Sequence, residues 1–258
     1  MIELIFIGAI IGLISSLLGV SGGFLLVPAL YYFYLSKNIS PEIAIKMAIG
    51  TSLFIIFINS LFSLYFHKKK LDIKSSLLIG IFGVLGSIIG GYLTITLFPE
   101  YLIKKIFAFF LIALSIYMLK KKDIYANGNI EDIRDKLPFL GFITGLISSM
   151  LGIGGGILII PSLNIVLNIP IKRAIKISIG VISIISFSGA LVYLSYPLKE
   201  IDSLYNIGYV SLLTTFIVLP PCIIFSKVGN YLANKINTKY LKILLAIVIF
   251  IGGIKMIL

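Results

Sequence analysis

The chain has 258 residues, of which 59% are hydrophobic and only 12% are charged. A soluble domain carries about 45–50% apolar and about 25% charged residues, so this composition excludes a soluble fold, and it excludes disordered and disulfide-rich chains as well. A mean hydropathy of +1.12 indicates an all-α polytopic membrane protein. The net charge of +12 would suit an acidic partner, depending on where the charges lie.

Most of the basic residues lie between the apolar stretches rather than within them. They cluster at residues 67–70, 120–122, 172–173 and 235–242. Lys and Arg in short loops set the orientation of membrane helices, and no soluble segment is long enough to form a basic face for nucleic acid. We therefore predict a chain embedded in the lipid bilayer, with no nucleic-acid partner.

Eight apolar stretches follow in chain order, over residues 4–35, 47–66, 75–98, 101–119, 137–169, 177–198, 204–226 and 240–258. The first would form a helix of about 48 Å, whereas the hydrocarbon core is about 30 Å thick. Glycine-rich segments interrupt the first and the fifth stretch, at Gly19–Gly23 and Gly152–Gly156. Each glycine costs about 1 kcal/mol inside a helix. Both stretches therefore predict two short helices that form a hairpin or a re-entrant element.

The two interrupted stretches repeat one another. Residues 8–30 and 141–163 share 14 of 23 positions at an offset of 133, and the similarity continues at 44–50 with 174–180 and at 87–93 with 226–232. We predict a first membrane repeat over 1–122, a connecting loop over 123–136 and a second repeat over 137–258. Each repeat would hold a glycine-broken hairpin followed by three transmembrane helices. Secondary transporters are commonly built from duplicated halves.

The basic residues also predict the topology. If each long stretch enters and leaves on the same side, 16 of the 22 Lys and Arg residues fall on one side and 6 on the other; single crossings would place 11 on each side. The positive-inside rule favours the uneven count. It predicts a multi-pass protein of the cytoplasmic membrane with both termini outside and inverted repeats. The number of crossings stays open.

The glycine breaks are the predicted binding site. A helix that restarts inside the membrane presents free N–H groups and a positive dipole end, which bind anions without a lysine. The alternative is that small residues only permit close helix packing. The predicted substrate-binding residues are Ser15, Ser16, Gly19, Ser21, Gly22, Gly23, Thr51, Ser52, Ser148, Ser149, Gly152, Gly154, Gly155 and Gly156, with helix kinks at Pro28 and Pro161.

The site is predicted to be asymmetric, because Val181 and Ile182 stand in the second repeat where Thr51 and Ser52 stand in the first. Lys46 and Lys176 lie at matching span starts. Either lysine would attract an anion at the mouth of the site or extend its charge to the membrane surface.

These residues resemble the TauE/SafE sulfite exporter family, also described as the toluenesulfonate uptake permease group. The shared pattern is a glycine-rich element that ends in proline, here Leu18–Pro28 and Leu151–Pro161, and a span start at Ala44–Ser52. The resemblance covers essentially the whole chain. The sequence departs from the family pattern at Ser21, which replaces a glycine, and at Val181-Ile182, which replace Thr-Ser. The resemblance implies export or uptake of sulfite, sulfonates or related small organic anions by a membrane permease.

Two rival functions fit the sequence less well. Gly19–Gly22 matches the GxSG pattern of rhomboid intramembrane proteases, but that chemistry needs a histidine base, and the single histidine, His67, adjoins a lysine run. A transporter of a different small solute or of a metal ion is the second alternative, although the spans hold essentially no acidic residue. We predict a transporter of a small anion by alternating access, not an enzyme, with no catalytic residues, no metal site and no cofactor. A homo-oligomeric state is left open.

Overall fold

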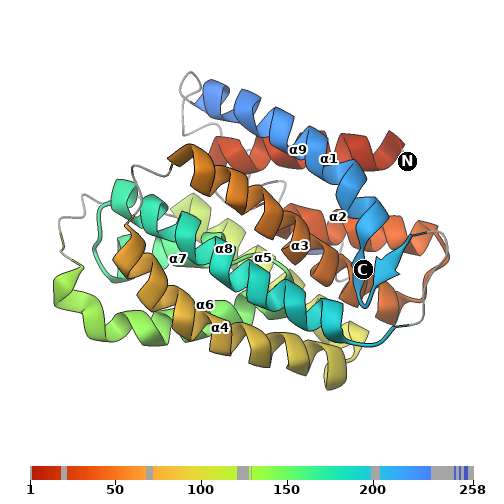
Figure 1. Cartoon of the computed structure of the whole chain (residues 1–258), viewed down its shortest axis with the longest axis horizontal. Coiled ribbons are helices and arrows are strands. Elements are labelled where there is room, and N and C mark those ends of the chain that lie inside the picture. Colours follow the sequence, from red (N-terminus) through yellow and green to blue (C-terminus); the bar gives the residue numbers. More distant parts are fainter. Residues whose placement is uncertain are drawn as a thin grey trace.

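In the computed structural model the chain forms a bundle of helices (Figure 1). The structure describes residues 2–18, 22–67, 72–120, 128, 130–198, 204–233, 247, 250 and 253–254. The first half contains α1 (Ile2–Leu18), α2 (Gly23–Ser36), α3 (Pro41–His67), α4 (Ile73–Thr96) and α5 (Glu100–Lys120). The second half contains a 3-10 turn (Glu131–Lys136), α6 (Leu137–Leu151), α7 (Gly156–Pro161), α8 (Ile171–Ser195) and α9 (Leu212–Ala233).

Both predicted helix breaks are present. Helix α1 ends at Leu18 and α2 begins at Gly23, whereas α6 ends at Leu151 and α7 begins at Gly156. Pro28 lies inside α2. Pro161 ends α7, and the chain continues as a π-helical turn over Ser162–Val166. Proline has no N–H group to donate to the helix ladder, so regular α-helix is disfavoured at this point.

Counting the described residues, four helices are long and apolar enough to cross a membrane: Pro41–Tyr65, Ile73–Thr96, Arg173–Ser195 and Leu212–Gly229. Large apolar side chains such as Phe6, Phe109 and Phe216 are exposed on the outside of the bundle. An apolar exterior of this extent is expected where lipid, not water, surrounds the helices. The chain is thus a mostly helical, multi-pass membrane protein.

The helices pack in pairs that join the two halves. Helix α1 lies along α9 at one edge of the bundle and α4 lies along α6 at the other, with α3 and α8 between them (Figure 1). Glycine permits close contact between the paired helices at both edges. A Cβ on Gly12 would overlap the carbonyl oxygen of Cys222, and a Cβ on Gly145 would overlap that of Gly83. The backbones can approach this closely because glycine has no side chain.

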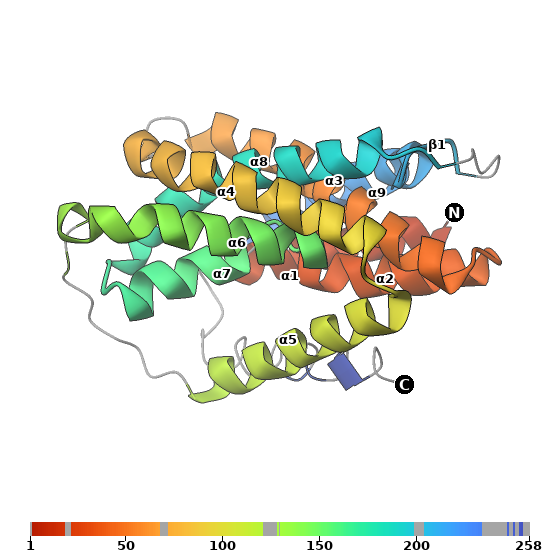
Figure 2. The same cartoon turned by 90° about the horizontal axis from the view of Figure 1, so that it is seen from below.

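One element was not predicted from the sequence. The apolar stretch 204–226 was expected to be a single helix, but it begins with a two-stranded hairpin of β1 (Asn206–Ile207) and β2 (Val210–Ser211). Gly208 turns the hairpin with a φ of +53°, and the N–H of Tyr209 donates to the carbonyl of Tyr193 at 2.9 Å. That bond satisfies a carbonyl at the end of α8. The hairpin lies at one end of the bundle, opposite the start of α4 (Figure 2).

Candidate functional site

The two glycine breaks meet inside the bundle. A Cβ on Gly23, at the start of α2, would lie 2.5 Å from the carbonyl oxygen of Gly152 and 2.8 Å from Cα of Ile153. The hydroxyl of Ser52 in α3 donates to the same carbonyl oxygen at 2.8 Å. The first break, the second span and the second break thus converge at one point, which we call the break junction (Gly23, Ser52, Gly152 and the turn Ile153–Gly156).

The backbone of the second break has a conformation that favours glycine. Gly152, Gly154 and Gly155 have φ values of +67°, +77° and +83°, in the left-handed region that side chains disfavour. Gly154 and Gly155 are buried, and among the described residues no backbone carbonyl accepts a hydrogen bond from their N–H groups. Unpaired, closely spaced N–H groups in a turn form a concavity suited to an anion.

Two serine hydroxyls face this turn. The Oγ of Ser186 in α8 lies 3.0 Å from the position that a Cβ on Gly154 would occupy, and the Oγ of Ser148 in α6 lies 3.7 Å from the corresponding position on Gly155. Both hydroxyls are fully buried and have no hydrogen-bond partner within the described part of the chain. Buried hydroxyls are nearly always paired, so these two hydroxyls stand out as hydrogen-bond donors not used within the described part of the chain.

Ser186 was missed by the sequence prediction. It is one of several serines in α8, including Ser178, Ser183 and Ser188, and each of those three donates to a carbonyl within its own helix. Nothing in the local sequence separates Ser186 from them. What distinguishes Ser186 is its position beside Gly154, which lies in another element.

Other predicted residues lie around the junction or away from it. Ser15 lies beside Gly22 and donates to the carbonyl of Gly12 at 3.2 Å. Ser16 donates to Leu13 and packs against α9, outside the junction. Ser149, also without a partner among the described residues, faces glycines of α4 and α8 instead of the turn.

Thr51 lies toward the hairpin. Its Oγ1 accepts hydrogen bonds from the hydroxyl of Tyr34 at 3.1 Å and from the N–H of Ser211 at 3.0 Å. The side chain therefore links α2 and α3 to strand β2, and its hydroxyl oxygen is already engaged. Gly19, Ser21 and the side chain of His67, on which the protease alternative depends, lie outside the described residues.

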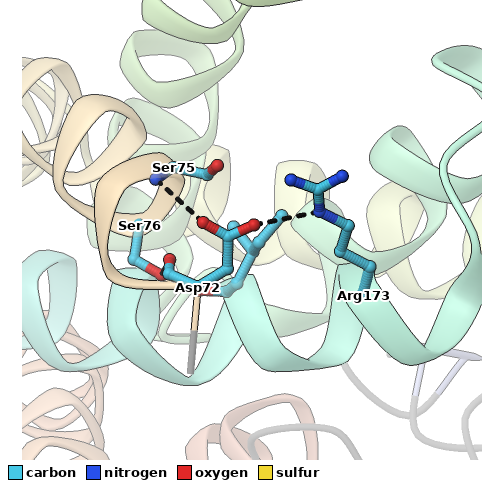
Figure 3. A network of polar contacts seen from close by, with 5 residues as sticks. Asp72, Ser75, Ser76 and Arg173 are labelled. Atoms are coloured by element: carbon cyan, nitrogen blue, oxygen red, sulfur yellow. Dashed lines mark hydrogen bonds and ion pairs between the residues drawn. The ribbon is translucent and has the colours of Figure 1, made fainter. Parts of the chain in front are cut away.

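The charged side chains lie near the helix ends. Lys46 is buried and pairs with Glu42 at 2.8 Å, and Lys176 is exposed. Asp72 caps α4 by accepting the N–H of Ser75 at 3.3 Å, and it pairs with Arg173 of α8 at 3.0 Å (Figure 3). Burial alone would raise the pKa of Asp72, but the bonds from Arg173 and Ser75 outweigh burial and hold that pKa below its ordinary value.

An open groove of about 750 Å³ lies between α3, α4 and α8. Its walls are mainly apolar, formed by residues such as Phe57, Ile88, Phe187 and Leu191. A groove of this kind suits an apolar chain better than an anion, and none of the predicted site residues lines it. Within the described residues, no group of three or more His, Cys, Asp or Glu side chains could hold a metal ion. The break junction therefore remains the best-defined polar site.

The chain has clear relatives among known proteins. Residues 4–256 match the family described as Sulfite exporter TauE/SafE. A "Probable membrane transporter protein" of Methanocaldococcus jannaschii is 42% identical over 99% of this chain and 94% of its own length. The "Probable membrane transporter protein YunE" of Bacillus subtilis is 28% identical over 98% of this chain and 96% of its own length. No solved structure matches the chain.

Proposed function

The chain belongs to the Sulfite exporter TauE/SafE family of membrane transporters, and we propose that it moves small anions such as sulfite, sulfonates or related organic anions across the cytoplasmic membrane. The observation that carries the proposal is the second glycine break. There, the N–H groups of the buried Gly154 and Gly155 have no backbone acceptor among the described residues, and two buried hydroxyls without a partner, those of Ser148 and Ser186, lie beside these glycines. Such donors, with the N-terminal end of α2 beside them, suit a negatively charged oxygen group.

We propose that the two halves are inverted repeats. Gly8 of α1 lies against the carbonyl of Val218, and Gly141 of α6 lies against that of Ile79. These contacts correspond under the offsets of the sequence repeat, 133 for the glycines and 139 for their partners. The first helix of each half therefore packs on the same position of the other half, which supports a pseudo-symmetric exchange of helices.

Capping contacts at opposite ends support the inversion. At the start of α4, Asp72 accepts the N–H of Ser75. At the start of α9, Ser211 accepts the N–H of Thr214 at 3.2 Å, and both residues are displaced by the same offset of 139. The first cap lies at the basic end of the bundle, where α4, α6 and α8 begin near Arg134, Lys136 and Arg173, and the second lies at the hairpin end (Figure 2). By the positive-inside rule the basic end would face the cytoplasm, with both termini outside.

In the mechanism that we propose, an anion binds at the break junction and one half rocks against the other, so that the junction opens to each side in turn. Duplicated transporters with discontinuous helices work in this way. No carboxylate of the described residues lies at the junction to carry a proton. If transport is coupled to protons, a proton could travel on the substrate itself.

Uptake into liposomes tests the proposal. Purified protein would be reconstituted and assayed with sulfite, sulfate, thiosulfate and a sulfonate, with and without a pH gradient. We expect transport of at least one anion, and we expect Gly155→Leu to abolish it because Gly155 has a φ of +83°. Gly22→Leu should do the same, because its side chain would collide with Ile11 and Ser15.

Cys222→Ala is the matched control. Cys222 is a buried residue of α9 that packs against α1, away from the break junction. This variant should transport at the rate of the unmodified protein. Unchanged transport in both glycine variants would show that the site lies elsewhere, and transport of none of the four anions would contradict the proposed function.

A further inference from the structure

Helices α1 and α9 form a closely packed pair at one edge of the bundle (Figure 1). A Cβ on Gly8 would overlap the carbonyl oxygen of Val218. One turn further along, a Cβ on Gly12 would overlap the carbonyl oxygen of Cys222. A shift of α1 along α9 would bring residues with side chains onto these carbonyl groups. We therefore expect the two helices to move as a unit, which we call the arm (α1 and α9).

The corresponding pair, α4 and α6, is attached to a third helix. The hydroxyl of Ser76 in α4 donates to the carbonyl of Ile177 in α8 at 3.0 Å, and the hydroxyl of Ser87 donates to that of Ile185 at 3.1 Å. A Cβ on Gly83 would lie 2.7 Å from Cδ1 of Ile185. Hydrogen bonds and close packing between helices are the main attractions available in lipid. They hold α4, α6 and α8 together as one body.

The serines of the arm bond within their own helices instead. Ser226 of α9 corresponds to Ser87 at the offset of 139, yet its hydroxyl donates to the carbonyl of Ile223 at 3.1 Å. Ser15 and Ser16 likewise donate to carbonyls of α1. Of the four candidate spans found in the described part of the chain, α9 is the least buried. Equivalent hydroxyls thus fix α4 to the core but leave the arm held mainly by other contacts.

The arm meets the rest of the bundle through apolar side chains and at the hairpin. Leu4 and Ile11 of α1 are buried in the same apolar core as Ile49 of α3. Strand β2, directly before α9, is bonded to α3, because the N–H of Ser211 donates to Oγ1 of Thr51 at 3.0 Å. Packed helices can slide over one another by small steps, whereas a hinge keeps its place. The hairpin end of the arm is therefore the more firmly fixed one.

We propose that the arm is the moving body of the transporter and turns about its hairpin end, against a scaffold of α2, α3, α4, α6 and α8. This inference rests on the proposed function and names the part that moves, a structural half that takes one helix from each half of the sequence. With the hairpin end fixed, the basic end of the arm moves furthest. Ile11 and Ser15 lie against Gly22 at the start of α2, so the movement would uncover the first break from the basic side.

Distances between paired spin labels in the full-length protein test this inference. Val228→Cys in α9 and Ile73→Cys in α4, both at exposed positions, would be introduced into the Cys222→Ala protein and labelled in liposomes. Double electron–electron resonance would be recorded in chloride, and then with whichever of sulfite, sulfate, thiosulfate and a sulfonate the uptake assay shows to be transported. We expect the distance distribution between α9 and α4 to shift, or to gain a second maximum, when that anion is present.

Two further label pairs are the controls. Ile10→Cys with Val228→Cys measures the distance between α1 and α9 inside the arm, and Ile73→Cys with Phe139→Cys measures that between α4 and α6 inside the scaffold. All four side chains are exposed. Both control distances should stay constant under every condition, because glycine contacts hold each helix pair together.

The possible failures are distinct. A constant distance between α9 and α4, in liposomes that transport an anion, would overturn the inference and leave the proposed function standing. A change inside the arm as large as the change between arm and scaffold would also overturn it, because α1 and α9 would then not move as a unit. If none of the four anions is transported, the proposed function is wrong and the inference fails with it.

Discussion

Gly145 shows how single glycines hold this bundle together. It lies in α6 at the point where the backbone of α4 passes, and a Cβ there would overlap the carbonyl oxygen and Cα of Gly83. Gly86 and Gly90 of α4 make the same kind of contact with Phe142 and Leu146 of α6. Without a hydrophobic driving force in lipid, such close packing is a main source of helix association.

Gly145→Ala should therefore destabilise the protein although alanine favours helix more than glycine does. We expect a loss of about 1–3 kcal/mol in the free energy of unfolding, the usual cost of overpacking. Chemical denaturation in detergent would measure it. Leu85→Ala, on the exposed face of α4, is the control and should change stability little; equal effects of the two substitutions would contradict the packing argument.

At the scale of elements, the ion pair between Asp72 and Arg173 joins the start of α4 to the start of α8. Ser76 adds a second contact between the same two helices, because its hydroxyl donates to the carbonyl of Ile177 at 3.0 Å. The carboxylate and the guanidinium are both partly exposed, so the ion pair itself contributes modestly. The contact matters chiefly because it fixes the position of a first-half helix relative to a second-half helix.

Asp72→Asn should lower the free energy of unfolding by about 0.5–1 kcal/mol at pH 7. The folded-state pKa of Asp72 lies below its ordinary value, so its stabilising effect is present above about pH 4 and is lost as the pH falls through the folded-state pKa. The difference between Asp72→Asn and the unmodified protein should therefore shrink as the pH falls through the lowered folded-state pKa of Asp72. Asp132→Asn, at an exposed site, should show no such difference; a gap that persists in acid would refute the ion-pair explanation.

The helix breaks were predictable because consecutive glycines disfavour helix wherever they occur. The hairpin at Asn206–Ser211 was not, because no glycine or proline separates its second strand from α9 and its bonds go to distant partners such as Thr51. The site was predictable only in part. Ser15 and Ser148 have the same Leu-Ile-Ser-Ser context, yet only the structure shows that one hydroxyl is engaged and the other is free.

The whole molecule carries two kinds of positive charge. The formal charge of +12 lies mainly in the connections, where it would orient the protein in the membrane. The positive character offered to the substrate comes instead from N–H groups and hydroxyls at a buried turn near Gly154 and Gly155. A site without formal charge would also release its anion more readily than a buried lysine would.

Locating a bound anion tests this central claim most directly. Selenite has the pyramidal shape of sulfite, and its selenium can be located by anomalous diffraction from crystals grown with it. We predict a selenium peak at the break junction, with selenite oxygens within hydrogen-bond distance of Ser186, Ser148 and the N–H groups of Gly154 and Gly155. A peak among the basic residues at the helix ends, for example at Arg173, with none at the junction would contradict it.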